Sequence, residues 1–162
     1  MNLKETGDVY VSFAEFTAVY GSDALTLTAF NRFEFDAEVL LDDWTTGIDG
    51  VHKLRVAFPT DPIDAAAVKR CAIELIKTLA DIDNLDALSV SGDGGVVASK
   101  SSGSESISYR DGSSALLAAA KDSGARAAYV GMIVRRYLSG RSDLNGVNLL
   151  YGGAYPVRGV IV

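Results

Sequence analysis

The stretch PIDAAAVKRCAIELIKTLADI, residues 62–82, carries the most regular hydrophobic pattern in this chain of 162 residues. Its apolar side chains recur at steps of three and four, the spacing that lines one face of an α-helix. Pro62 is compatible with a first helical turn, and Asp61 precedes it as a capping residue. The pattern predicts about five turns of amphipathic helix. Its core face comprises Val68, Cys71, Ala72, Leu75, Leu79 and Ile82.

Two patterns upstream also predict helices. In SFAEFTAVYG, residues 12–21, Ser12 and Glu15 have the spacing of a capping box, and Gly21 is a typical stop. A second helix is expected to begin at Ser22 or Thr26 and to end near residues 42–47. Its apolar face should be core and comprises Leu27, Phe30, Phe33, Ala37, Leu40 and Trp44.

Residues 47–62 hold two glycines and two prolines around a short apolar run. They predict a connection with a brief strand at Lys53 to Phe58. Residues 111–140 return to helical character, with a break at DSG, residues 122–124, and a stop at Gly140. On this last helix the pattern predicts one face made of Ala128, Met132, Val134 or Arg135, and Leu138.

Two short alternating runs joined by the serine-rich SGSE, residues 102–105, predict a β-hairpin at about 96–110. Its faces are weakly apolar, and an isolated two-stranded ribbon is marginal in water. We therefore expect it to rest on a neighbouring subunit or another protein. The residues expected to make this contact are Val97, Ser99, Lys100, Ser106, Ile107 and Tyr109.

The last part of the chain, residues 145–162, combines several glycines and a proline with apolar side chains and does not predict a long helix. An apolar tail without an element of its own usually docks on another surface. We expect a mainly α fold: a small bundle of about four helices over residues 1–144, with the short hairpin, followed by an extended C-terminal arm at 145–162.

The composition argues against several classes of function. The net charge of −6 and a pI near 4.7 argue against a protein that binds nucleic acid through a positive electrostatic potential over its whole surface. The single cysteine, Cys71, excludes an internal disulfide and fits a reducing cytoplasm. No apolar run approaches the roughly 18–20 residues needed to cross a bilayer. The N-terminus lacks the apolar segment of a secretion signal, so we expect a soluble, unexported protein.

Catalytic residue types are scarce. His52 is the only histidine, which leaves little material for a zinc site or a serine-type triad, and no cofactor is expected. Asp36, Glu38, Asp42 and Asp43 are ordinary for an exposed helix face, although paired carboxylates also serve acid/base chemistry. The one basic cluster, Arg135, Arg136 and Arg141, is interpreted as a solvated face or as a contact to an acidic partner or DNA phosphate.

The order of several segments resembles the head-tail connector, or head-completion adaptor, family of tailed bacteriophages and prophages. The resemblance covers roughly residues 12–156. The segments that carry it are FNRFEFDAEVLLDDWTTGIDG (30–50), VAFPTDPIDAAAVKRCAIELIKTL (56–79), GGVVASKSSGSESISYR (94–110), YLSG (137–140) and GVNLLYGGAYP (146–156). Each motif is weak alone, and their order in one short chain is more specific.

The resemblance implies a non-enzymatic virion protein that forms a ring of about twelve copies beneath the portal vertex. The ring would extend the DNA channel, through which the genome passes without sequence-specific binding, and would receive the downstream neck, stopper or tail-terminator protein. The protein would act in the virion neck after assembly in the host cytoplasm, with no membrane partner. The arm residues implied in portal binding are Leu149, Leu150, Tyr151, Tyr155, Val157, Val160, Ile161 and Val162.

Two other functions remain open from sequence. A tail-completion or tail-terminator protein of the same virion would favour a β-rich sandwich over a helical bundle. A small hydrolase or binding enzyme would have to use Asp42, Asp43 and His52.

Overall fold

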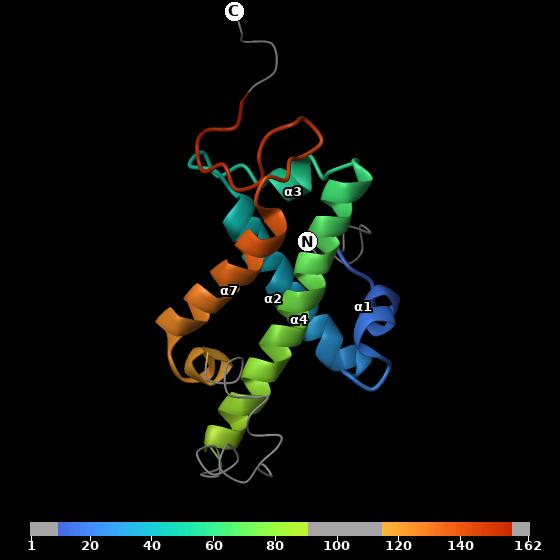
Figure 1. The fold of residues 1–162 in the computed structure, drawn as a ribbon, viewed down its shortest axis with the longest axis vertical. Helices are drawn as coiled ribbons and strands as arrows, with labels where there is room; N and C mark the ends of the chain where they lie inside the picture. The colour runs from blue at the N-terminus through green and yellow to red at the C-terminus, as the bar shows by residue number, and fades with distance from the viewer. Residues whose placement is uncertain (1–9, 91–114, 157–162) are drawn as a thin grey trace, which may run out of the picture.

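The computed structural model describes residues 10–90 and 115–156 and is mainly helical (Figure 1). Its named helices are α1 (Phe13–Tyr20), α2 (Leu27–Thr45), α3 (Lys53–Val56), α4 (Pro62–Val90) and α7 (Ser123–Leu138). Residues 115–121 are also helical. Within these ranges the only β interactions are isolated bridges, Thr46 with His52 and Ser142 with Asn148. The prediction of a mainly α fold is confirmed, while the predicted hairpin at about 96–110 lies outside the described residues.

Helix α4 is the central element, and both α2 and α7 pack along it. Its 29 residues give a length of about 43 Å. The carboxylate of Asp61 accepts hydrogen bonds from the backbone N–H groups of Ile63 and Asp64 at 2.9 and 3.1 Å, so Asp61 caps the helix as predicted. The helix runs beyond Ile82, where the sequence pattern ended, because Ile82 and Leu85 pack against the helical residues 115–121.

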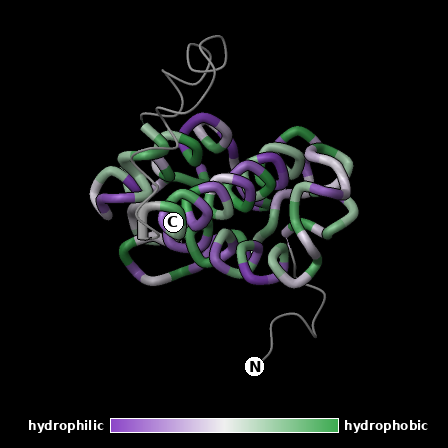
Figure 2. Tube along the Cα trace, turned by 90° about the horizontal axis from the view of Figure 1, so that it is seen from below, coloured by the Kyte–Doolittle hydropathy of each residue, from purple (hydrophilic) through white to green (hydrophobic). Residues whose placement is uncertain are grey.

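The predicted core is confirmed. Phe30, Val68, Cys71 and Leu75 are buried, whereas Leu40, Trp44 and Leu79 are half-buried and pack against the same cluster. Leu27, at the first position of α2, is exposed instead of buried. In the view from below (Figure 2), hydrophobic and hydrophilic positions alternate along the coiled segments, as amphipathic helices require.

The face of α7 that meets the bundle differs from the predicted one. Val134 and Leu138 are buried, but Met132 is exposed and Ala128 faces solvent. Gly131 accounts for the rotation, because a Cβ atom there would lie 2.9 Å from Cζ2 of Trp44. The missing side chain lets the indole ring of Trp44 lie directly against the helix.

The connection between α2 and α4 contains a helix where a strand was predicted. Residues Lys53–Val56 form α3, and the backbone N–H of Ala57 donates to the Lys53 carbonyl at 2.8 Å. Leu54 and Ala57, three positions apart, are both buried; a helix places them on one face, whereas a strand would place them on opposite faces. No helix in the described ranges is long and apolar enough to span a membrane.

Helix α1 begins and ends as predicted. Ser12 and Glu15 form a capping box, and Gly21 closes the helix with φ of 90°. Phe16 is fully buried and packs against Phe30 of α2, with ring centroids 5.5 Å apart.

Candidate functional site

One end of the bundle is closed by two loops that are far apart in the sequence, residues 46–58 and 141–156, which we call the end cap (Figure 1). Backbone hydrogen bonds join them. The N–H of Ile48 donates to the Gly152 carbonyl at 2.9 Å, and the N–H of Leu144 donates to the Ala57 carbonyl at 2.9 Å. A Cβ atom at Gly47 would lie 2.2 Å from the Gly153 carbonyl oxygen, so the loops approach too closely for any larger residue there.

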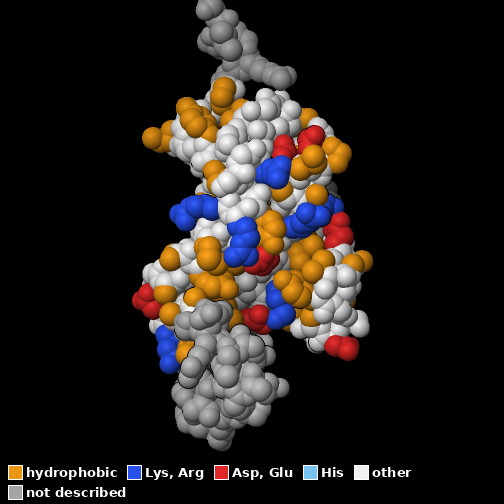
Figure 3. Space-filling model, viewed as in Figure 1, with side chains coloured by type: hydrophobic (Ala, Val, Ile, Leu, Met, Phe, Trp, Pro, Cys, Tyr) orange, Lys and Arg blue, Asp and Glu red, His pale blue; other side chains and the backbone are white. Residues whose placement is uncertain are grey.

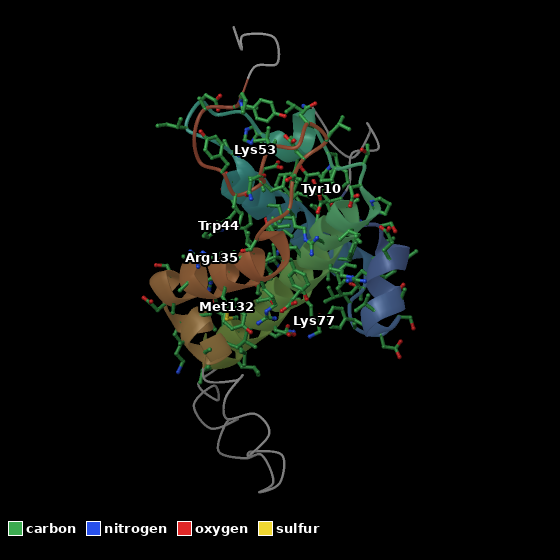
Figure 4. All side chains as sticks on the ribbon, turned by 45° about the horizontal axis from the view of Figure 1, so that its top comes forward. Tyr10, Trp44, Lys53, Lys77, Met132 and Arg135 are labelled. Carbon is green, nitrogen blue, oxygen red and sulfur yellow. The ribbon has the colours of Figure 1, made fainter. Side chains whose placement is uncertain are left out.

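Lys53 lies at the centre of the end cap and is fully buried (Figure 4). Its ammonium group donates to the Thr45 carbonyl at 3.0 Å and to the Tyr151 carbonyl at 2.5 Å. The first of these carbonyls belongs to the last turn of α2, where no intrahelical donor remains. Burial lowers the pKa of Lys53, and the carboxylates of Asp143 and Asp49 oppose that shift. Lys53 therefore attaches the C-terminal segment to α2.

Two aspartates fix the rest of the C-terminal segment. Asp143 accepts hydrogen bonds from the N–H groups of Asn145 and Val147 at 2.8 and 2.9 Å, which shapes the turn. It also accepts the Tyr155 hydroxyl at 2.6 Å. Asp49 accepts the Tyr155 N–H at 2.8 Å, and this bond lowers the pKa of the Asp49 carboxyl. Residues 143–155 are thus tied to their own subunit at several points.

This arrangement corrects part of the predicted arm. Leu149 was expected to dock on another protein, but it is fully buried in the core of its own subunit. Leu150 is half-buried against the same core, while Tyr151 is 49% exposed. Residues 145–156 are therefore an integral part of the end cap and not an extended arm. The predicted contacts at Val157, Val160, Ile161 and Val162 lie outside the described residues.

The outer surface of the end cap carries four exposed large apolar side chains. Ile48 is 85% exposed, and Val56, Leu144 and Tyr151 are each about half exposed or more. The backbone bonds that join the loops bring Ile48 next to Gly152 and Leu144 next to Ala57. In Figure 3, hydrophobic side chains gather at this end of the molecule. Exposed apolar side chains that come together from separate segments are typical of protein contact surfaces.

The densest group of charged side chains lies elsewhere, beneath Tyr10. Glu34, Glu38 and Asp42 recur every four residues on one face of α2 and are only 2–6% exposed. Arg55 lies over Asp42, with Nε 2.5 Å from Oδ2, and reaches Glu38 at 3.9 Å. The Tyr10 hydroxyl donates to Asp42 at 2.5 Å, and the Tyr10 N–H donates to Glu38 at 3.1 Å.

Three carboxyl groups and one guanidinium cannot all be charged in a buried site without a large energetic cost. Burial raises the pKa of Glu38 to about 8, and its hydrogen bond with Glu34 adds to the rise. The surroundings of Glu38 thus favour its protonated form near neutral pH. Burial and the bond to Asp42 also raise the pKa of Tyr10. The network joins residues 10–11 and α3 to α2, and its side chains bond to one another.

The residues of a hypothetical hydrolase do not converge. Asp42 is buried in the network just described, whereas Asp43 is exposed on the outer side of α2. Nδ1 of His52 lies 2.7 Å from the Thr46 hydroxyl, which itself donates to the Asp42 carbonyl at 2.5 Å. Because that hydroxyl has one hydrogen, His52 must donate to Thr46 and cannot act as its base. The contact between His52 and Thr46 therefore stabilises the loop.

The three arginines of the predicted basic cluster have different environments. Arg135 stacks on the Trp44 ring, with its guanidinium carbon 5.0 Å from the ring centroid (Figure 4). Arg136 pairs with Glu74 of α4 at 3.0 Å. Arg141 approaches Asp64 near the start of α4 at 3.5 Å. Only Arg135 lacks a carboxylate partner within the described part of the chain.

A small surface pocket of about 140 Å³ between α2 and α4 is also lined by charged side chains. Arg32 pairs there with Asp83 at 3.1 Å, and Arg126 donates to the carbonyls of Ala119 and Ala120. Both guanidinium groups are therefore engaged by the protein itself. Across residues 10–90 and 115–156, no group of three potential metal ligands converges.

Sequence reasoning missed Lys53 and the buried acidic row. Lys53 sits in a run interpreted as a strand, and no pattern marks a buried lysine. Glu34, Glu38 and Asp42 did carry a signal: they recur at steps of four beside the apolar positions Phe33 and Ala37, so they belong to the buried half of α2.

Comparison of the chain with models of known protein families, with curated proteins and with solved structures finds no match.

Proposed function

We propose that the chain is a non-enzymatic structural protein of the phage neck, a head-tail connector that forms a ring of about twelve copies on the portal. The ring would extend the DNA channel and receive the downstream neck or tail-terminator protein. The ordered motifs described above suggest this role, and the helical architecture favours a connector over a β-rich tail terminator.

The apolar end cap is the observation that carries the proposal. It presents Ile48, Val56, Leu144 and Tyr151 on one end of an elongated bundle. The contacts of Lys53 and Asp49 hold this surface in one conformation, so little conformational entropy would be lost on binding. In the proposed ring, this end meets the portal.

The described part of the chain ends in the end cap. Tyr155 is anchored through both its N–H and its hydroxyl, and Pro156 follows at the outer surface. Residues 157–162, VRGVIV, follow it in the sequence. We propose that Val157, Val160, Ile161 and Val162 extend the portal contact from there. The hairpin residues around 96–110 would contact a neighbouring subunit or neck protein.

The test is co-sedimentation of the purified chain with the portal ring encoded in the same genome. Ile48→Asp places a charge on the end cap and should weaken binding at least tenfold, about 1.4 kcal/mol. Val19→Asp is the matched control, because Val19 is also an exposed apolar residue, at 60%, but lies on α1. It should bind as the unmodified chain does.

A truncation separates the two parts of the contact. A chain that ends at Pro156 keeps Leu149 and every end-cap bond, so it should fold normally and bind the portal weakly. A genome without a portal gene near this one, or an unmodified chain that never joins portal rings or particles, would overturn the proposal.

A further inference from the structure

The outer side of α2 presents an apolar and acidic surface that its own subunit does not use. Phe35 and Val39 are 47% and 42% exposed and lie one helical turn apart. Asp36 and Asp43 flank them, are exposed, and form no ion pair with another described residue. We call these four residues the α2 ridge. Phe35, Val39 and Asp43 lie on the exposed side of α2, whereas Asp36 lies at the border of the pocket between α2 and α4.

A second surface, on α7 and α4, has the opposite charge. Met132 is 42% exposed, and Arg135 and Arg136 follow it by three and four residues, so the three side chains share one side of α7. Arg70 of α4 is exposed and has no ion-pair partner among the described residues. Figure 3, which views the α4 and α7 side, shows Lys and Arg side chains across the middle of that side. We call Arg70, Met132, Arg135 and Arg136 the arginine face.

The two surfaces complement each other in both chemistry and layout. Each has apolar side chains bordered by charges, acidic on the ridge and basic on the arginine face. Asp36 and Asp43 are seven residues apart, which spans about 10 Å along the helix and suits two separate guanidinium partners. Aromatic side chains, Met and Arg are also the residue types enriched in protein interfaces.

We propose that the α2 ridge of one subunit packs against the arginine face of a second copy of the same chain. The two surfaces differ, so the contact is heterologous: each subunit offers its ridge to one neighbour and its arginine face to another. Such a contact propagates into a ring when the rotation closes. That the assembly closes as a connector ring rests on the proposed function; the pairwise contact does not.

Disulfide trapping between two single-cysteine variants tests the contact. Val39→Cys and Met132→Cys each place one thiol on one of the two surfaces, and the native Cys71 is fully buried. Equimolar mixing under mild oxidation should give severalfold more disulfide dimer than either variant alone. The matched control replaces Val39→Cys with Val19→Cys, an exposed position on α1.

Charge exchange tests the polar part of the same contact. Asp36→Arg with Asp43→Arg, added to the Val39→Cys chain, should lower the dimer yield with Met132→Cys severalfold. Adding Arg70→Glu and Arg135→Glu, which break no ion pair between described residues, to the Met132→Cys chain should restore it. Asp23→Arg, in the exposed loop before α2, should change nothing. Raising the salt concentration should reduce trapping in the unmodified pair.

Each outcome has a definite meaning. A mixed-dimer yield no higher than that of the Val19→Cys control overturns the contact, and strong dimerisation of Val39→Cys alone indicates a symmetric contact and overturns it as well. If trapping fails while the chain still joins portal rings, this interface is wrong and the connector role stands. If trapping succeeds while portal binding fails, the reverse holds.

Discussion

Helices α2, α4 and α7 pack through apolar side chains, whereas the end cap combines the buried Leu54 and Leu149 with polar contacts, several of them to backbone atoms. In the bundle, Leu75, Ile133 and Leu138 are fully buried in the hydrophobic core. In the end cap, Lys53, Asp49 and Asp143 supply the bonds. Apolar packing tolerates many side chains of similar size, whereas a hydrogen bond depends on particular donor and acceptor atoms. The bundle should therefore determine stability, and the hydrogen bonds of the end cap should determine the conformation of its surface.

The largest effect is expected in the bundle. Leu75→Ala removes a fully buried side chain from α4 and leaves a cavity, which should lower the free energy of unfolding by about 2–5 kcal/mol. Chemical denaturation of the whole chain measures it. Leu27→Ala, at an exposed position of α2, is the control and should cost less than about 0.5 kcal/mol. Equal losses in the two variants would mean that the apolar packing described here does not control stability.

A smaller and more local effect is expected in the end cap. Lys53→Met fills similar space but leaves the Thr45 and Tyr151 carbonyls without their donor, which should cost about 1–3 kcal/mol. Hydrogen exchange should rise at residues 148–156 more than in α4. Lys69→Met, which removes a partly exposed pair with Glu15, should leave that segment unchanged. If α4 loses protection to the same extent, the bundle and the end cap unfold as one unit.

A third expected effect concerns the pH dependence of stability and is expressed per pH unit. Glu38 has a pKa of about 8 in the folded protein and about 4.3 when unfolded, so the folded state binds the extra proton between these values. Its contribution is fully present below pH 4.3 and is lost as pH rises through 8, with a slope of at most about 1.4 kcal/mol per pH unit. Glu38→Gln should flatten the stability profile from pH 5 to 8. Asp43→Asn, at an exposed site, should keep the slope. An unchanged slope in Glu38→Gln would show that Glu38 is ionised in the folded state.

Helices α1, α2 and α4 could be predicted from the sequence because their signals are local. Capping at Ser12, Thr26 and Asp61 and the periodic positions around Phe30 and Leu75 involve residues within a few positions of one another. The exposed position of Met132 did not follow, because the rotation of α7 depends on Trp44, which is 87 residues from Gly131 and touches it only in the folded chain.

The end cap could be predicted from the sequence only in part, because its structure also depends on contacts between residues that are distant in the sequence. Its apolar composition around Leu149, Leu150 and Tyr151 was visible, but its division into a buried Leu149 and an exposed Tyr151 was not. That division depends on residues 46–58, which lie about a hundred positions away in the chain.

The sequence by itself determined that the chain is helical, where α1 and α4 begin, and which side chains of α4 are core, since helix capping and amphipathic spacing act over one to three turns. Only the tertiary structure decided that the C-terminal residues up to Pro156 belong to their own subunit and that Lys53 is their anchor. The physical reason is that a buried lysine is stable only where distant backbone carbonyls meet it, and that meeting exists only once the helices have packed.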